Sequence, residues 1–320
     1  MESSLIDRFT GDLDGLIAPD ARIGIAVSGG PDSLALLLLA AAARPGLIEA
    51  ATVDHGLRPE GRAEAVMVAE LAEGLGVPHS ILTARWNGHP QTAIQERARG
   101  ERYRLLGYWA EERGLNALAT AHHADDQAET LLMRLSRGSG VRGLAGMRPR
   151  AITPGSHVRL IRPLLCWRRS QLKQICDDAG LAPAADPSNE DDRFERVRIR
   201  RALSEADWLD PVAVARSASH LADADSGLDW AMKAEWKQAL RESGGTIIYR
   251  VSEAPPEIVR RVIARAIRRL ASEGEAELRG PELDRLLATL SEGRTATIRG
   301  VICRGGDTQW RFSRAPARRY

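Results

Sequence analysis

The sequence predicts an α/β fold, a doubly wound parallel sheet followed by a mostly helical C-terminal domain. In the first half, short apolar runs typical of buried strands alternate with longer amphipathic runs typical of helices, and this order produces parallel sheets. The predicted strands are 23–27, 48–53, 79–83 and 117–120, and the predicted helices are 33–43, 61–74, 92–113 and 125–137. Ligands of such sheets bind outside the carboxyl ends of the strands, so the residues after each strand are the first site candidates.

The second half changes character. A strand is expected over 157–161, a helix over 168–179 and a turn at 186–189. From Arg193 the chain becomes mostly helical and arginine-rich, and its end alternates apolar and polar residues as a terminal hairpin does. The helices expected there cover 211–241 and 258–270, and the hairpin covers 296–303 and 309–312. We therefore predict two domains, 1–200 and 201–320.

Composition limits the classes of protein. The 320 residues are enough for two domains, or for one large domain with an extension, and a hydrophobic content of 43% supports a real core. No run of about 18 apolar residues appears and the N-terminus lacks a signal pattern, so we expect no membrane span and a cytoplasmic location. Cys166, Cys176 and Cys303 are too widely spaced for a metal knuckle or a disulfide framework. The net charge of +2 divides into −4 for residues 1–192 and +6 for 193–320, where 24 basic residues face 18 acidic ones, and a basic half is compatible with RNA.

A glycine-rich turn follows the first predicted strand. Gly29 and Gly30 have no Cβ, so the backbone can bend sharply and approach a phosphate, and the helix that follows directs its first N–H groups at the anion. The turn lacks the G-x-x-x-x-G-K-[ST] spacing and has no lysine for terminal phosphates. Asp32 suits a Mg²⁺ ion shared with a pyrophosphate.

A second constellation follows the fourth predicted strand, where His122 and His123 precede a helix. Asp126 and Glu129 are three residues apart and share one face of that helix, so together they can hold a cationic amine or a metal ion. The adjacent histidines do not have the i, i+4 spacing of a zinc helix. The alternatives are a helix cap at Asp125 and solvated acids.

The elements occur together in one order: Ser28-Gly29-Gly30-Pro31-Asp32-Ser33, then V-D-H-G-L-R at 53–58, Glu96-Arg97-Ala98-Arg99 with Arg102-Tyr103, HH-x-x-D-x-x-E-T from His122, and I-R-P-L-L at 161–165. This set resembles the tRNA(Ile)-lysidine synthetase family, a bacterial branch of the Rossmann-like PP-loop ATP pyrophosphatases. The resemblance covers residues 22 to about 201.

The resemblance implies an ATP-dependent ligase. Such enzymes join free L-lysine to C2 of the wobble cytidine in the CAU anticodon of tRNA(Ile), through an adenylated cytidine, and release AMP and diphosphate. The lysidine product changes the codon that the tRNA reads from a methionine codon to an isoleucine codon. It also changes the amino acid with which the tRNA is charged from methionine to isoleucine. The resemblance also implies ATP and Mg²⁺ as cofactors, a tRNA-binding C-terminal domain after a catalytic domain, and a homodimer.

It assigns residue roles as well. Catalysis is expected from Asp32, Asp126, Glu129 and Arg200; ATP binding from Ser28, Gly29, Gly30, Pro31, Asp32, Ser33, Asp54, His55 and Arg162, with Asp32 as the Mg²⁺ ligand; and substrate binding from His123, Asp126, Glu129, Arg99 and Arg196. Val197 stands where the family has asparagine, between two retained arginines. With only 4% aromatic residues, arginine is the expected stacking partner for the extruded base.

Three other functions are weighed against this interpretation. A PP-loop thiolation enzyme would need paired cysteines, often C-x-x-C, and the sequence has none. An amidating ligase would need an ammonia source, and no glutaminase-like cysteine is evident. A nucleotide-sensing or RNA-binding protein without activity would not need Asp32, Asp126 and Glu129 together.

Overall fold

The computed structural model describes residues 1–56, 60–86, 94–183, 193, 195–272, 278 and 280–316. The predicted turn at 186–189 lies outside the described residues, as do 57–58 of the second motif and 92–93 of a predicted helix. The chain divides into two compact units, Met1–His220 and Leu221–Tyr320. This division falls inside one continuous helix, α9 (Pro211–Ala239), whereas the composition of the sequence changes near residue 200.

The first unit contains a six-stranded sheet with the order β3-β2-β1-β4-β6-β5. All neighbouring strands are parallel except β5, which lies antiparallel at one edge. The strands are β1 (Ile23–Ala26), β2 (Ile48–Asp54), β3 (His79–Thr83), β4 (Ala117–Ala119), β5 (Arg150–Ile152) and β6 (Arg159–Ile161). The predicted doubly wound sheet is thus confirmed. The three-residue β5 was not predicted.

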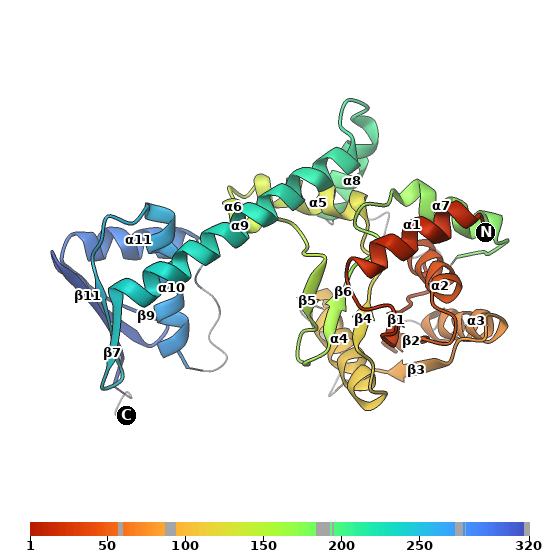
Figure 1. Ribbon diagram of the computed structural model, residues 1–320, viewed down its shortest axis with the longest axis horizontal. Helices are drawn as coiled ribbons and strands as arrows, with labels where there is room; N and C mark the ends of the chain where they lie inside the picture. The colour runs from red at the N-terminus through yellow and green to blue at the C-terminus, as the bar shows by residue number, and fades with distance from the viewer. Residues whose placement is uncertain are drawn as a thin grey trace. The chain divides into compact units, whose positions relative to one another are not determined.

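Helices cover both faces of this sheet (Figure 1). One apolar core joins the sheet to α1, α2, α3 and α7, and a second core joins the other face to α4. The helices of this unit are α1 (Ser3–Asp14), α2 (Pro31–Ala43), α3 (Glu60–Gly74), α4 (Ile94–Glu112), α5 (Ala124–Leu135), α6 (Val141–Leu144), α7 (Arg169–Asp178) and α8 (Glu195–Glu205). Of these, α1 and the four-residue α6 were not predicted; α1 buries Phe9 and Leu13 against α2.

Tight packing around β1 fixes the loop that follows it. A Cβ at Gly24 would lie 2.6 Å from a ring carbon of Trp109 on α4, so only glycine lets the helix approach this closely. On the other face, Leu34 and Leu37 of α2 are fully buried. The strand is therefore packed between two cores, and this packing fixes the position of the residues at its carboxyl end.

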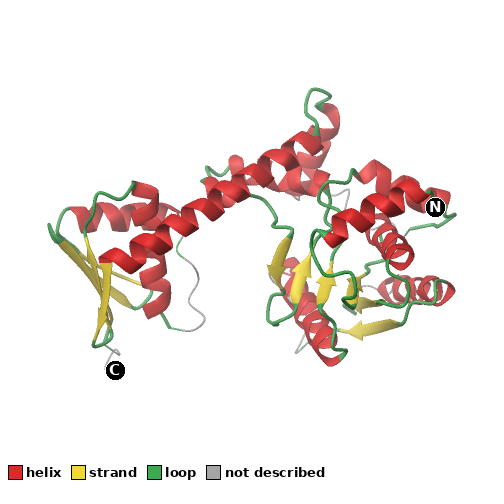
Figure 2. Ribbon diagram, viewed as in Figure 1, coloured by secondary structure: helices red, strands yellow, loops and turns green. Residues whose placement is uncertain are grey.

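The second unit combines helices with a five-stranded antiparallel sheet of the order β7-β8-β11-β10-β9 (Figure 2). Its strands are β7 (Leu240–Ser243), β8 (Thr246–Arg250), β9 (Thr295–Ile298), β10 (Val301–Arg304) and β11 (Gln309–Arg314), and its helices, besides the end of α9, are α10 (Pro256–Leu270) and α11 (Gly280–Ser291). The helices predicted around 211–241 and 258–270 form, although 240 and 241 belong to β7. The predicted hairpin strand 296–303 is two strands, β9 and β10, joined by a turn at 299–300, and the strands β7 and β8 were not predicted. None of the described helices is both long and apolar enough to span a bilayer.

Candidate active site

The loop after β1 is closed by its own hydrogen bonds. Gly29 adopts a φ of 82°, in the left-handed region that favours glycine. The backbone N–H of Ser28 donates to Ser33 Oγ at 3.1 Å, and Ser33 Oγ donates to the carbonyl of Gly30 at 2.9 Å. Pro31 then occupies the first turn of α2, where a missing N–H costs nothing. The loop is thus a preformed turn at a helix N-terminus, the arrangement that binds anions.

Asp32 in the first turn of α2 has one carboxylate oxygen that makes no hydrogen bond in the described structure. Its Oδ1 is buried and has no hydrogen-bond partner among the described residues. Its Oδ2 lies 3.5 Å from Nε2 of His123. No group of three His, Cys, Asp or Glu side chains able to hold a metal occurs in the described part of the chain. A Mg²⁺ ion here would therefore take Asp32 as one ligand and its other ligands from phosphate and water, the usual pattern for this ion.

His123 connects this loop with the second motif, at the end of β4. Its side chain is 2% exposed, and its ring nitrogens lie 3.5 Å from carboxylate oxygens of Asp32, Asp125 and Asp126. Burial by itself would lower the pKa of His123, but the close carboxylates of Asp125, Asp32 and Asp126 raise it to about 10. The structure thus places an imidazolium between two acids that the sequence separates by more than ninety positions.

We expect His123 to keep its proton far above neutral pH. Its pKa of about 10 exceeds the ordinary value of 6.5, so the charged ring stabilises the fold fully below pH 6.5, and this contribution is lost as the pH rises toward 10. Nitrogen chemical shifts of the ring, followed by NMR from pH 6 to 11, measure it. Asp32→Asn should lower the titration midpoint, whereas a ring that deprotonates near pH 6.5 in the unaltered protein would contradict the assignment.

Asp126 and Glu129 on α5 are not solvated surface acids. Nη2 of Arg196 lies 2.7 Å from Oδ1 of Asp126, and Nε of Arg196 lies 2.5 Å from Oε2 of Glu129. Nε of Arg200, one turn further along α8, donates to Oε1 of Glu129 at 2.6 Å. The Glu129 side chain is 2% exposed. Burial would raise its pKa, but Arg200 and Arg196 together lower it, so the group is ionised.

Two further predicted arginines lie near the same strand end. Nη1 of Arg162 donates to the carbonyl of Arg148 at 2.6 Å, while its buried Nε has no partner among the described residues. The guanidinium of Arg99 lies 5.1 Å from the ring centre of Tyr103. Burial lowers the pKa of His122 to about 4; Asp126 opposes this, and the charges of Arg162, Arg99 and Arg196 add to it. Arg162 and Arg99 therefore add positive charge near His122, which suits an anion, whereas Arg196 is already paired with Asp126 and Glu129.

Asp54 and His55 form a separate group at the end of β2. Asp54 Oδ1 accepts the backbone N–H of Gly56 at 2.9 Å, which fixes the turn. The ring of His55 stacks on Trp86 with 6.5 Å between ring centres, and Trp86 Nε1 donates to the His55 carbonyl at 2.7 Å. Burial and the nearby Arg102 lower the pKa of His55 to about 4, against the opposing charges of Asp54 and Glu101. The result is a neutral aromatic pair.

Trp86 and Arg102 were missed as site residues. Trp86 follows β3 by three positions, so the strand-end rule could have found it. Arg102 stood in a recognised element, and its Nε lies 3.5 Å from Nε2 of His55. The strands β1 and β2 are neighbours, so this group and the Ser28–Ser33 loop lie at adjacent strand ends.

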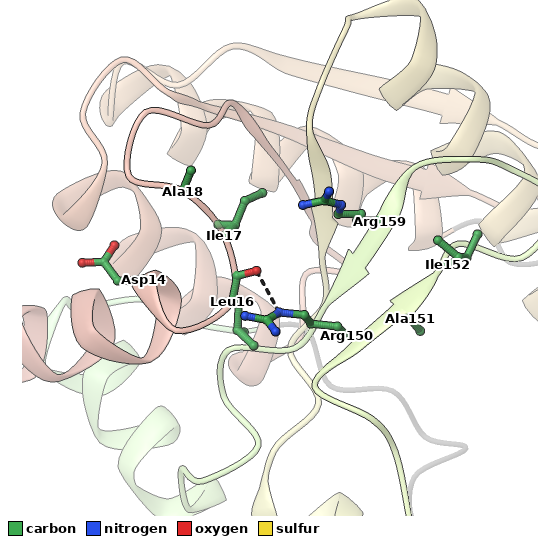
Figure 3. A pocket seen from close by; sticks show the side chains of 8 residues that line it. All are labelled: Asp14, Leu16, Ile17, Ala18, Arg150, Ala151, Ile152 and Arg159. Carbon is green, nitrogen blue, oxygen red and sulfur yellow. Dashed lines mark hydrogen bonds between the residues drawn. The ribbon is translucent and has the colours of Figure 1, made fainter. Parts of the chain in front are cut away.

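A hollow of about 700 Å³ lies elsewhere in the first unit (Figure 3). It is lined by the segment after α1 and by β5 and β6, and Nε of Arg150 donates to the Leu16 carbonyl there at 3.0 Å. Arg159, the β6 residue in its lining, is at the amino end of that strand, away from the carboxyl ends where the motifs lie. None of the predicted site residues lines this hollow.

Comparison with known proteins gives consistent results. The family model described as PP-loop domain matches residues 3–206. A protein named tRNA(Ile)-lysidine synthase from Novosphingobium aromaticivorans is 48% identical over 318 residues, which cover 99% of this chain and 96% of the relative. A protein of the same name from Zymomonas mobilis is 42% identical over 301 residues, or 93% and 90% of the two chains.

One solved structure supports the fold. The U34-tRNA thiolase NcsA from Methanococcus maripaludis, solved with its [4Fe-4S] cluster, superposes with a TM-score of 0.57 at 16% identity. The match covers 68% of this chain and 78% of that one. At this identity the likeness concerns the architecture alone.

Proposed function

The chain belongs to the tRNA(Ile)-lysidine synthase family of PP-loop enzymes, and from this premise we propose which of its residues act in each step of the reaction. It is an ATP-dependent ligase that joins lysine to the wobble cytidine of tRNA(Ile) through an adenylated cytidine. The observation that carries the proposal is the contact of His123 with both Asp32 and Asp126. This contact joins the loop proposed to bind ATP to the acids proposed to bind the lysine amine.

The first step is adenylation of the base. The cytidine O2 attacks the α-phosphate, and diphosphate leaves. The closed Ser28–Ser33 loop binds the leaving phosphates through the N-terminus of α2, and the imidazolium of His123 and Arg162 add positive charge nearby. The stacked His55 and Trp86 offer the nucleotide an aromatic contact at the neighbouring strand end. Mg²⁺ held by Asp32 would neutralise charge on the phosphates.

The second step is attack by lysine. The ε-amine has an ordinary pKa of about 10.4, so it must lose a proton before it attacks C2 and AMP leaves. Asp126 is the acid proposed to receive the ammonium. The backbone N–H of His123 holds its Oδ2 at 3.1 Å, and the ammonium would replace Arg196 at its Oδ1. Both oxygens of Glu129 are already bound by arginines, so an incoming ammonium must exchange with Arg196 or Arg200 there. Those guanidinium groups would then be available to the adenylate or a tRNA phosphate.

The cysteines distinguish this reaction from thiolation. Cys166 is exposed, Cys176 is buried, with its Sγ donating to the Pro31 carbonyl, and Cys303 is buried in the second unit. No pair of neighbouring cysteines is available for sulfur transfer or a cluster. A homodimer and a cytoplasmic location remain predictions from the sequence.

Incubation with ATP, Mg²⁺, labelled lysine and a tRNA(Ile) transcript bearing CAU tests the function. We expect lysine in the tRNA, with one AMP and one diphosphate released for each lysine transferred. A transcript in which the wobble cytidine is changed to uridine is the matched control and should accept no lysine. Transfer of sulfur or ammonia in place of lysine would overturn the assignment.

A further inference from the structure

The sheet of the second unit has two unlike faces. Side chains alternate between the two faces along each strand, and Tyr249, Phe312 and Cys303 are among the apolar residues buried on the face that packs against the helices. Figure 2 shows these helices on one side of the sheet. The residues at the alternate positions, such as Ile248 and Arg311, belong to the opposite, outer face.

Four exposed arginines occupy the outer face: Arg241, Arg250, Arg304 and Arg311. Arg241 is opposite Ile248, Ile248 is opposite Arg311, and Arg311 is opposite Arg304, so one row crosses four neighbouring strands. Arg250 is two residues from Ile248 on β8, which makes it a diagonal neighbour of Arg311. We call these four residues the arginine face.

Among the described residues, no acidic side chain accompanies the arginine face. Glu242 is the one acid in the five strands, all of which are described, and it shares a register position with the buried Ile247 and pairs with Arg269 of α10 at 2.9 Å. No carboxylate among the described residues pairs with the four arginines. By contrast, Arg261 of the same unit is enclosed by Asp225, Asp229 and Glu257.

This arrangement is unfavourable for the sheet by itself. Like charges directly opposite each other on neighbouring strands destabilise the pairing, and Arg304 and Arg311 are such a pair. An external anion that lies across the row removes the repulsion. Arginine presents a planar fork that matches phosphate oxygens, and a sheet holds several such forks at a regular spacing of about 4.8 Å per strand.

We propose that the arginine face binds the phosphate backbone of the tRNA substrate. The proposal rests on the proposed function, which supplies the tRNA. Backbone contact is favoured over base stacking because the aromatic residues of these strands, Tyr249, Trp310 and Phe312, are buried on the helix-covered face. The face therefore contributes affinity that depends on salt and little on sequence.

The test measures tRNA binding by the full chain at several KCl concentrations. Arg304→Ala with Arg311→Ala should raise the Kd for the tRNA(Ile) transcript roughly tenfold. It should also reduce the slope of the logarithm of the binding constant against the logarithm of the KCl concentration by about 2, because two phosphate contacts are lost. The control is Arg268→Ala with Arg285→Ala, which removes the same charge from α10 and α11 on the other side of the sheet. An equal effect of both double variants would overturn the proposal.

Arg311→Glu separates binding from folding. It places a carboxylate opposite Arg304, so the Tm should be unchanged or higher while tRNA binding weakens. Unchanged tRNA affinity in this variant, while the unaltered enzyme transfers lysine, refutes the arginine face and leaves the proposed function intact. Absence of lysine transfer by the unaltered enzyme, with tRNA binding still weakened by these variants, refutes the function and leaves the face intact.

Discussion

Asp126→Asn is expected to abolish the use of lysine while the adenylation step continues. The asparagine keeps the size of the side chain and still accepts the His123 N–H now bound to Oδ2 at 3.1 Å, so the turn into α5 should persist. It loses the negative charge that receives the ammonium and its proton. Loss of a positioned base costs about 10²–10⁴-fold, and we expect the kcat/KM for lysine to fall by that factor.

Two assays on the same variant separate the steps. The single-turnover rate of diphosphate release from ATP and tRNA, without lysine, should stay within about threefold of that of the unaltered enzyme. The reason is that the substitution leaves the binding of ATP unchanged. Labelled lysine transfer should be lost. Equal loss in both assays would contradict the assigned role, since it would mean that Asp126 serves the nucleotide or the fold.

The main features of the catalytic unit could be predicted from the sequence. Strand periodicity predicted four of the parallel strands within about one residue at each end, and the strand-end rule placed the Ser28–Ser33 loop and the His122–Glu129 segment at carboxyl ends of strands; the structure shows that these strands, β1 and β4, are neighbours. Short or unpatterned elements were not predictable in this way. The three residues of β5 are too few for a period, and β7 begins where α9 ends, without an intervening turn.

The environment of the acids also required the structure. Sequence spacing showed that Asp126 and Glu129 share a helix face, but it left a solvated surface as an alternative. The partners of Glu129, Arg196 and Arg200, are on α8, some seventy positions later, and only folding brings them within hydrogen-bond distance. The same holds for Asp32 and His123, whose contact depends on β1 and β4 being neighbours.

Asp32→Asn should have the opposite signature to Asp126→Asn. Asp32 has a buried oxygen free for a cation beside the phosphate loop, so removal of its charge should impair adenylation itself. A cation at the phosphates contributes several kcal/mol to such a transition state, which corresponds to a loss of about 10²–10³-fold in diphosphate release. Raised Mg²⁺ should restore part of the rate if the carboxylate acts through the ion.

Asp125→Asn is the matched control for this experiment. Asp125 is exposed to nearly the same degree, 23% against 25% for Asp32, and also lies 3.5 Å from a ring nitrogen of His123. Its other contacts, however, are with α7, where it accepts the Arg169 N–H at 2.9 Å. Both substitutions remove a carboxylate from His123, and only one removes it from the phosphate loop. If both slow diphosphate release equally, Asp32 acts through the charge of His123 and the assignment of Asp32 to the cation is wrong.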